Sequence, residues 1–312
     1  MTFHHETVLL HETVTALLPR PGGVYLDGTA GGGGHTALLL RRMQEPRGKR
    51  QEIGHIYALD RDPDAVAALR ARFAGKPAVT VLHGNFFEAD KLISEPLDGA
   101  LLDLGASSHQ LDTAQRGFSY HKEAPLDMRM SQTGVTAAQL VNTLPEADLR
   151  QILYDYAQEK FAPRIARAIV NARAAAPIET TTQLAEIVAR AVPAAARREA
   201  HPARKTFMAL RYACNGELDG LEEALLTLFG MLKPGGRLAV ITFNSLEDAA
   251  VKRVTKALTA GCECPPDFPV CVCGKAPRAR VPQKPITPLE GELKRNGRSR
   301  SAKLRTLEKA GL

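Results

Sequence analysis

The chain has 312 residues, of which 44% are hydrophobic, and a formal net charge of +7 at neutral pH. That length suits one large domain or two, and the apolar content excludes a disordered or fibrous protein. No apolar run reaches the roughly 18 residues that span a bilayer. The first residues include Glu6 and the adjacent His4 and His5, where a signal peptide carries a basic segment. We therefore expect a cytoplasmic protein with no membrane partner.

Five short apolar segments predict strands, and helical segments separate the first three. The expected strands are residues 24–27, 56–60, 79–83, 100–103 and 237–243, and the expected helices between them are residues 36–43 and 63–73. Asp62 before Pro63 is a typical helix start, because Asp caps the free amides and proline suits the first helical position. This alternation predicts an α/β fold with a parallel, doubly wound sheet.

A glycine-rich turn follows the first strand, in the run Tyr25-Leu-Asp-Gly-Thr-Ala-Gly-Gly-Gly-Gly-His35. Glycine permits positive φ and close approach of a ligand, and the next helix offers free amides. Gly32-x-Gly34-x-x-Ala37 fits a dinucleotide fingerprint. However, Asp27 precedes the glycines, and a carboxylate there would repel a pyrophosphate. It would attract the ammonium and sulfonium of S-adenosylmethionine, so we favour a methyl donor over a dinucleotide or a purely structural turn.

Acidic residues end three of the expected strands. Asp27, Asp60 and Asp103 each stand at a carboxyl end, where open α/β sheets bind their ligands. A carboxylate such as Asp60, at the end of the second strand, is typical of groups that hold ribose hydroxyls. We expect the three side chains to face one crevice.

The alternation stops after the fourth strand. Residues 111–212 show only helical periodicity, including residues 146–158, a helix from Pro163, and one after Thr180, which could form a capping box with Gln183. We expect a methyltransferase domain made of residues 1–110 and 213–312, and an inserted helical substrate-recognition domain of residues 111–212.

Positive charge is unevenly distributed. Residues 275–312 hold eleven Lys and Arg but three Asp and Glu, and residues 150–212 are also basic. Such clusters suit a nucleic-acid backbone or a solvated surface equally well. The candidate phosphate contacts in the helical insert are Arg164, Arg167, Arg197, Arg198, Arg204 and Lys205.

Four cysteines lie close together, as Cys262-x-Cys264 and Cys271-x-Cys273. In a cytoplasmic protein such a cluster suggests a metal more than disulfides. Zinc ligands are usually separated by two to four residues, so this spacing would strain a single site. Metal ligands, reduced thiols and a redox pair all remain open, and we assign no metal.

With these residues placed, the sequence resembles the bacterial RsmH (MraW) family of rRNA methyltransferases nearly end to end. The resemblance rests on several blocks in order. They are Thr7-Val-Leu-Leu-His-Glu12, Asp27-Gly-Thr-Ala-Gly-Gly-Gly-Gly-His35, Leu59-Asp-Arg-Asp-Pro63, Leu101-Leu-Asp-Leu-Gly-Ala-Ser-Ser-His-Gln-Leu-Asp112, Arg116-Gly-Phe-Ser119, Pro125-Leu-Asp-Met-Arg-Met130, His201-Pro-Ala-Arg-Lys-Thr-Phe207 and Ser245-Leu-Glu-Asp248.

The resemblance implies a class I, S-adenosylmethionine-dependent enzyme with a Rossmann-like sheet and an inserted all-helical domain. It also implies methylation of the exocyclic N4 of a cytosine in the decoding centre (P-site region) of 16S rRNA. The small ribosomal subunit or its RNA would be the partner, and the chain could be a monomer or a homodimer.

Site residues also follow from the resemblance. Besides Asp27, the cofactor residues that it implies are Gly33, Gly34, His35, Asp60, Phe86, Asp103 and Gln110. The first three would line the amino-acid end of the cofactor, Asp60 the ribose, and Phe86 the adenine, although the adjacent Phe87 competes for that role. Asp103 would also accept a hydrogen bond from the target amine, as the candidate catalytic residue.

Two positions depart from the family pattern. Asn244 stands where the family usually has histidine, and Gln158 replaces an expected acid before Glu159. Any role that needs a titrating group at either position is therefore in doubt. The alternatives to a methyltransferase are an NAD-dependent Rossmann oxidoreductase and a non-catalytic RNA-binding assembly factor.

Overall fold

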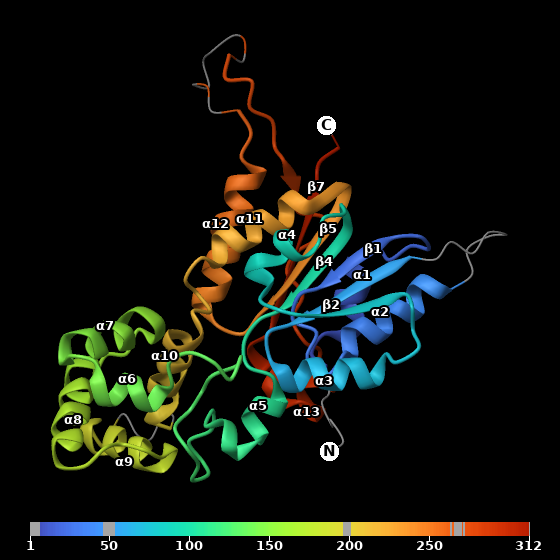
Figure 1. Cartoon of the computed structure of the whole chain (residues 1–312). Helices are drawn as coiled ribbons and strands as arrows, with labels where there is room; N and C mark the ends of the chain where they lie inside the picture. Colours follow the sequence, from blue (N-terminus) through green and yellow to red (C-terminus); the bar gives the residue numbers. More distant parts are fainter. Residues whose placement is uncertain are drawn as a thin grey trace. The chain divides into compact units, whose positions relative to one another are not determined.

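The structure is a computed structural model, and it describes residues 7–45, 54–195, 201–262, 264, 270 and 272–311 (Figure 1). The chain forms two compact units. Unit 1 comprises Met1–Gly105 and Gly220–Leu312, and unit 2 comprises Ala106–Asp219. None of the helices within the described ranges is long and apolar enough to cross a membrane.

Unit 1 is built on a seven-stranded sheet with the order β3-β2-β1-β4-β5-β7-β6. Strands β1 to β5 are parallel, and β7 runs antiparallel to β5 and β6. The strands are β1 (Val24–Asp27), β2 (His55–Asp60), β3 (Val79–His83), β4 (Leu97–Asp103), β5 (Leu232–Thr242), β6 (Ala279–Arg280) and β7 (Lys303–Lys309). The predicted α/β class and the five predicted strands are confirmed.

Helices cover both faces of this sheet. They are α1 (Leu10–Ala16), α2 (Gly34–Gln44), α3 (Pro63–Arg72), α4 (Ala89–Leu92), α11 (Leu221–Met231), α12 (Ser245–Thr259) and α13 (Glu290–Arg295), with the 3-10 turns η1 (Phe86–Glu88) and η4 (Gly297–Ser301). Helices α1, α2 and α3 lie over one face, and α4, α11 and α12 lie over the other (Figure 1). The Asp62 carboxylate accepts the Asp64 amide at 3.0 Å, so α3 starts where the sequence predicts.

Two strands at the C-terminal edge were missed by the sequence analysis, as were the first five residues of β5. Strand β7 buries three consecutive residues, Thr306, Leu307 and Glu308, so its sequence lacks the alternation that predicts a strand. Strand β6 has only two residues, which is too short to show a pattern. Glu308 accepts hydrogen bonds from Arg237 and Arg280 across the sheet. Arg280, one of the basic residues near the end of the chain, is therefore paired with an acid of the same segment.

Unit 2 is helical and has its own apolar core. Its elements are α5 (Ser108–Asp112), η2 (Ala114–Arg116), α6 (Ala137–Thr143), α7 (Glu146–Ala157), α8 (Ala162–Ala175), α9 (Thr181–Ala191) and α10 (Ala203–Asn215). Leu149, Leu153 and Ile165 are at most 1% exposed within this core. The capping box of Thr180 and Gln183 forms as the sequence predicts.

Candidate cofactor site

The glycine-rich turn joins β1 to α2 and is held between two neighbouring strands. The Gly28 amide donates to the Leu101 carbonyl, and the Ala30 amide donates to the Leu59 carbonyl, both at 3.0 Å. Gly33 has φ of 76° and precedes α2, which has no side-chain N-cap. The turn therefore leads directly into the amino-terminal end of α2, the positive end of the helix dipole.

Close packing accounts for two glycines of the turn. A Cβ atom at Gly33 would lie 2.8 Å from the Phe73 ring, and one at Gly34 would overlap the Thr7 hydroxyl. A cavity of about 830 Å³ opens beside Gly32 and Gly34, and its walls carry both signs of charge. Its wall includes the acids Glu12 and Glu292, the bases Arg41, Arg72 and Arg295, and the imidazole of His11.

Asp27 is completely buried beneath the turn. Its carboxylate accepts the Thr36 hydroxyl at 2.7 Å and, more weakly, the Thr29 amide at 3.4 Å. Burial, with a smaller contribution from the negative charge of Asp60, raises the pKa of Asp27 to about 7 even though the hydrogen bonds from Thr36 and Thr29 lower it. Asp27 therefore holds the two ends of the glycine turn and is only partly ionised at neutral pH.

Asp60 connects β2 to the same turn. Its two oxygens accept the amides of Gly31 and Asp62, each at 2.8 Å. Burial raises the pKa of Asp60, partly offset by these hydrogen bonds. Each carboxylate oxygen can accept more than one hydrogen bond, so the group retains acceptor capacity for ribose hydroxyls.

Asp103 ends β4 and has an unusual environment. Its amide donates to the Thr29 hydroxyl at 2.6 Å, while its Oδ1 atom is buried and has no hydrogen-bond partner among the residues that the structure describes. Burial raises the pKa of Asp103 well above its ordinary value, and the charges of Asp27, Glu247 and Glu292 add to that shift. A buried polar atom without a partner is costly, so this oxygen is suited to a donor brought by a ligand.

Phe86 and Phe87 are placed differently, although both are half-buried. The Phe86 Cβ lies 3.2 Å from the position of a Cβ on Gly28, which puts Phe86 beside the start of the glycine turn. The Phe87 ring lies 3.8 Å from the equivalent position on Gly220, at the start of α11. The geometry thus favours Phe86 over Phe87 as the aromatic residue of the turn.

The remaining predicted cofactor residues are His35 and Gln110. His35 is 3% exposed in the first turn of α2. Gln110 belongs to unit 2, where its side-chain oxygen accepts the Ser107 amide at 2.9 Å in a capping box. The predicted cofactor residues of unit 1 therefore surround the strand ends, whereas Gln110 lies in the other unit.

Both departures from the family pattern have local structural roles. The Asn244 side chain caps α12 by accepting the amides of Leu246 and Glu247 at 2.9 and 3.0 Å. Asparagine is among the best N-caps, so this role needs no titrating ring. Gln158 ends α7 in the left-handed conformation with φ of 46°, and its carbonyl accepts Lys205 Nζ at 3.0 Å.

Exposed cations line part of unit 2. Arg164, Arg167 and Arg204 are exposed, and Arg167 lies 3.7 Å from Glu146. The predicted contacts Arg197 and Arg198 lie outside the described residues.

An aromatic cluster in unit 2 was missed by the sequence analysis. The rings of Tyr120 and His201 are stacked with centroids 4.2 Å apart, and His121 and Phe207 also contact Tyr120. Tyr120 and His201 are far apart in the sequence, so no local pattern could have paired them. His121 and His201 are exposed and offer ring surface to a ligand.

The sheet order with its antiparallel β7, the glycine turn after β1 and the acidic strand ends define a class I methyltransferase. The family model described as "MraW methylase family" matches residues 2–310 of the chain. The chain belongs to this family, and it is a methyltransferase that uses S-adenosylmethionine.

Full-length relatives agree with this assignment. The chain is 50% identical over 320 residues to "Ribosomal RNA small subunit methyltransferase H" of Heliobacterium mobile, covering 99% of this chain and all of that protein. It is 51% identical over 315 residues to the protein of that name from Pelobacter propionicus, covering 98% of this chain and 99% of the relative. Membership of a methylase family decides against the NAD-dependent oxidoreductase.

Proposed function

We propose that this protein transfers a methyl group from S-adenosylmethionine to the N4 atom of a cytosine in the decoding centre of 16S rRNA, in its P-site region. Support for an RNA substrate comes from the names of the relatives, which describe small-subunit rRNA methyltransferases. The identity of the base comes from the family resemblance of the sequence blocks.

The observation that carries the choice of site is the group of acids at the strand ends. Asp27, Asp60 and Asp103 all have raised pKa values, and two of them are raised in part by another member of the group. A site that concentrates negative charge in this way favours a cation and disfavours a pyrophosphate. When bound, S-adenosylmethionine supplies an electrophilic methyl group on a positively charged sulfur.

The proposed roles of the unit 1 residues are those that the family resemblance implies, and the positions of these residues around the glycine turn support them. Asp60 accepts hydrogen bonds from the ribose hydroxyls, and Phe86 packs against the adenine. Gly33 and Gly34 allow the amino-acid end of the donor to approach the start of α2, next to His35. The charged walls of the adjacent cavity suit a group that carries both an ammonium and a carboxylate. Asp27 holds the turn and adds negative charge.

Asp103 is the proposed positioning partner of the target amine. Its Oδ1 atom would accept a hydrogen bond from the cytosine N4 amino group, aiming the nitrogen lone pair at the methyl carbon. Orientation of two reactants can contribute roughly 7–11 kcal/mol to lowering a barrier. The N–H proton is lost after the N–C bond has formed, so the reaction needs no strong base.

Unit 2 is the proposed RNA-recognition unit. Arg164, Arg167 and Arg204 would contact phosphates, and the ring cluster of Tyr120, His121 and His201 would stack on unpaired bases. A base in structured RNA must leave its stack to reach a catalytic pocket, at a cost of a few kcal/mol. Stacking on exposed rings would offset part of that cost.

The test is a methylation assay with labelled S-adenosylmethionine and two substrates, under-methylated small subunits and naked 16S rRNA. Digestion and mass spectrometry identify the modified nucleoside. We expect N4-methylcytidine at a single decoding-centre position, and no product with Asp103→Ala. Label on another base, or none on either substrate, would contradict the proposal.

A further inference from the structure

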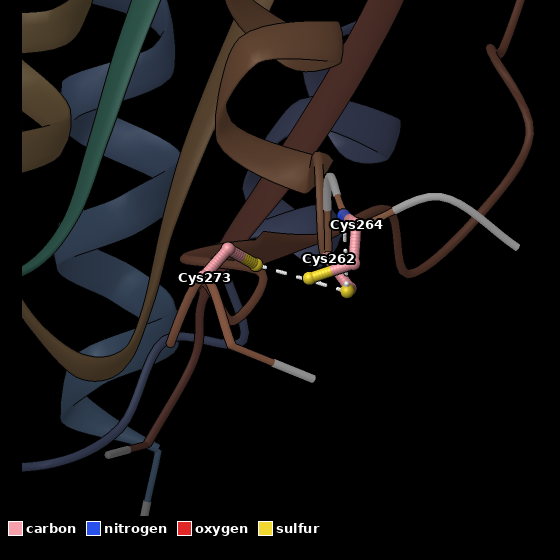
Figure 2. Close-up of side chains that lie close together, drawn as sticks. All are labelled: Cys262, Cys264 and Cys273. Atoms are coloured by element: carbon pink, nitrogen blue, oxygen red, sulfur yellow. Dashed lines mark hydrogen bonds between the residues drawn. The ribbon is translucent and has the colours of Figure 1, made fainter. Parts of the chain in front are cut away.

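Three cysteines that methyl transfer does not use lie together in unit 1 (Figure 2). The sulfur atoms of Cys262, Cys264 and Cys273 all lie within 4.8 Å of one another, and those of Cys262 and Cys273 are 3.7 Å apart. A disulfide would bring two sulfurs to about 2.05 Å, so these are thiols. The fold brings Cys273 to the pair of Cys262 and Cys264, and Cys271, the fourth cysteine of the predicted cluster, lies outside the described residues.

The separation of the sulfurs matches a thiolate metal site. Ligands at about 2.3 Å from a tetrahedral zinc ion are about 3.8 Å from one another, close to the distance between Cys262 and Cys273. Backbone amides also point at the sulfurs, because the Cys264 amide donates to the Cys262 sulfur and the Val272 amide donates to the Cys264 sulfur, each at 3.4 Å. Such N–H···S bonds favour the thiolate, which is the form that binds metals.

The position of the cluster separates it from the methyl-transfer site. It lies between α12 and β6, in the segment that follows α12 and leads to β6, whose described parts are orange in Figure 1. The Arg278 amide donates to the Leu258 carbonyl, and the Ala310 amide donates to the Arg278 carbonyl. Ala310 follows β7, which is antiparallel to β5, so this junction lies at the amino edge of the parallel strands. Asp103 lies at the opposite, carboxyl edge.

The described part of this segment has little apolar burial to hold it. Val270 and Val272 are 69% and 73% exposed, and Cys262 is exposed as well. Short segments without a hydrophobic core are commonly stabilised by a metal or a cross-link. A metal on three thiolates would provide that stabilisation.

We propose that Cys262, Cys264 and Cys273 bind one Zn²⁺ ion, which holds the α12–β6 segment in place. Binding releases the thiol protons to solvent and forms three Zn–S bonds without any change of oxidation state. The fourth tetrahedral position is left for a further ligand. The role is structural, because the site lies at the edge of the sheet away from the proposed methyl-transfer residues.

The experiment measures metal content in the full-length protein purified under reducing conditions. We expect one zinc per chain by mass spectrometry of the metal, and loss of zinc in the triple variant Cys262→Ser, Cys264→Ser and Cys273→Ser. The matched control is Cys214→Ser, since Cys214 is the half-buried thiol of α10 in unit 2 and should leave zinc content unchanged. S-adenosylmethionine binding serves as the check that each variant is folded.

A second measurement avoids relying on the variants. Chelation of the wild-type protein should increase amide hydrogen exchange in peptides between α12 and β6, and leave peptides that contain Asp103 unchanged. Cobalt substitution should produce a thiolate-to-metal charge-transfer band that the triple variant lacks. The proposal is overturned if the wild-type protein neither contains nor takes up zinc, if the triple variant keeps it, or if the thiols hold copper(I) or form a disulfide.

Discussion

Asp27→Asn should change the stability of the protein in opposite directions at low and high pH. The pKa of Asp27 rises from its ordinary 3.8 to about 7 in the folded chain because the carboxylate is buried. The folded state therefore holds this proton more tightly than the unfolded state, and stability falls as the pH rises from about 4 to about 7. Above pH 7, this difference between the folded and unfolded pKa of Asp27 lowers the free energy of unfolding by about 4 kcal/mol.

The substitution removes this cost and adds a smaller one. The asparagine oxygen can still accept the Thr36 hydroxyl, but its amide group faces the Thr29 amide, and the lost hydrogen bond costs about 1–3 kcal/mol. We therefore expect Asp27→Asn to be less stable than the wild type below about pH 4, where wild-type Asp27 keeps its proton, and about 1–3 kcal/mol more stable at pH 8. Urea unfolding followed by far-UV circular dichroism measures both differences.

Asp98→Asn is the matched control for this experiment. Asp98 is also buried, but its ion pairs with Lys233 and Arg20 and the Val24 amide outweigh burial and lower its pKa. Its carboxylate stabilises the fold most above its unfolded pKa, so removing the charge should destabilise the protein at pH 8. The reasoning is refuted if Asp27→Asn loses stability at pH 8 by as much as Asp98→Asn does.

Three further predictions concern single substitutions. Gly33→Ala should weaken S-adenosylmethionine binding at least tenfold, as measured by calorimetry. The control Gly75→Ala has a similar φ of 71° but lies in open space, so it should leave binding unchanged and lower the free energy of unfolding by only about 1–2 kcal/mol. Equal losses of binding in the two variants would contradict this account. Phe86→Ala should reduce cofactor affinity more than Phe87→Ala, and the reverse order would exclude Phe86 as the adenine contact. Asn244→Ala should lower the free energy of unfolding by about 1 kcal/mol, with Asn244→Asp retaining it, because the position is an N-cap; a loss of the same size in the Asp variant would argue against capping.

The sequence was sufficient for the parts of the fold that depend on local patterns. Buried parallel strands are continuous apolar runs, so β1 and β4 were predictable, and so was their common edge with Asp27 and Asp103. Strand β7 was not predictable, because its burial depends on pairing with β5 and β6 and on ion pairs such as that of Arg305 with Asp248. The periodicity of the β7 sequence does not identify those partners.

The burial and charge environment of the site residues also could not be predicted from the sequence. The order of residues indicates that Asp103 ends a strand, but the buried oxygen and the charges around it follow from the packing of distant elements. The same holds for the stacked rings of Tyr120 and His201, and for the return of Cys273 to Cys262. In each case the chemistry arises from two segments that only the fold brings together.

The most direct test of the central claim is a count of the protons released when S-adenosylmethionine binds. The claim is that a cationic methyl donor binds beside acids whose pKa values are raised, so its charge should lower those pKa values and expel protons. Calorimetry at pH 7 in two buffers of different ionisation enthalpy measures this number. We predict a net release of protons when S-adenosylmethionine binds. The number should be smaller for S-adenosylhomocysteine, whose sulfur is uncharged, and smaller in Asp27→Asn than in the wild type. Proton uptake, or equal exchange for the two ligands, would contradict the account.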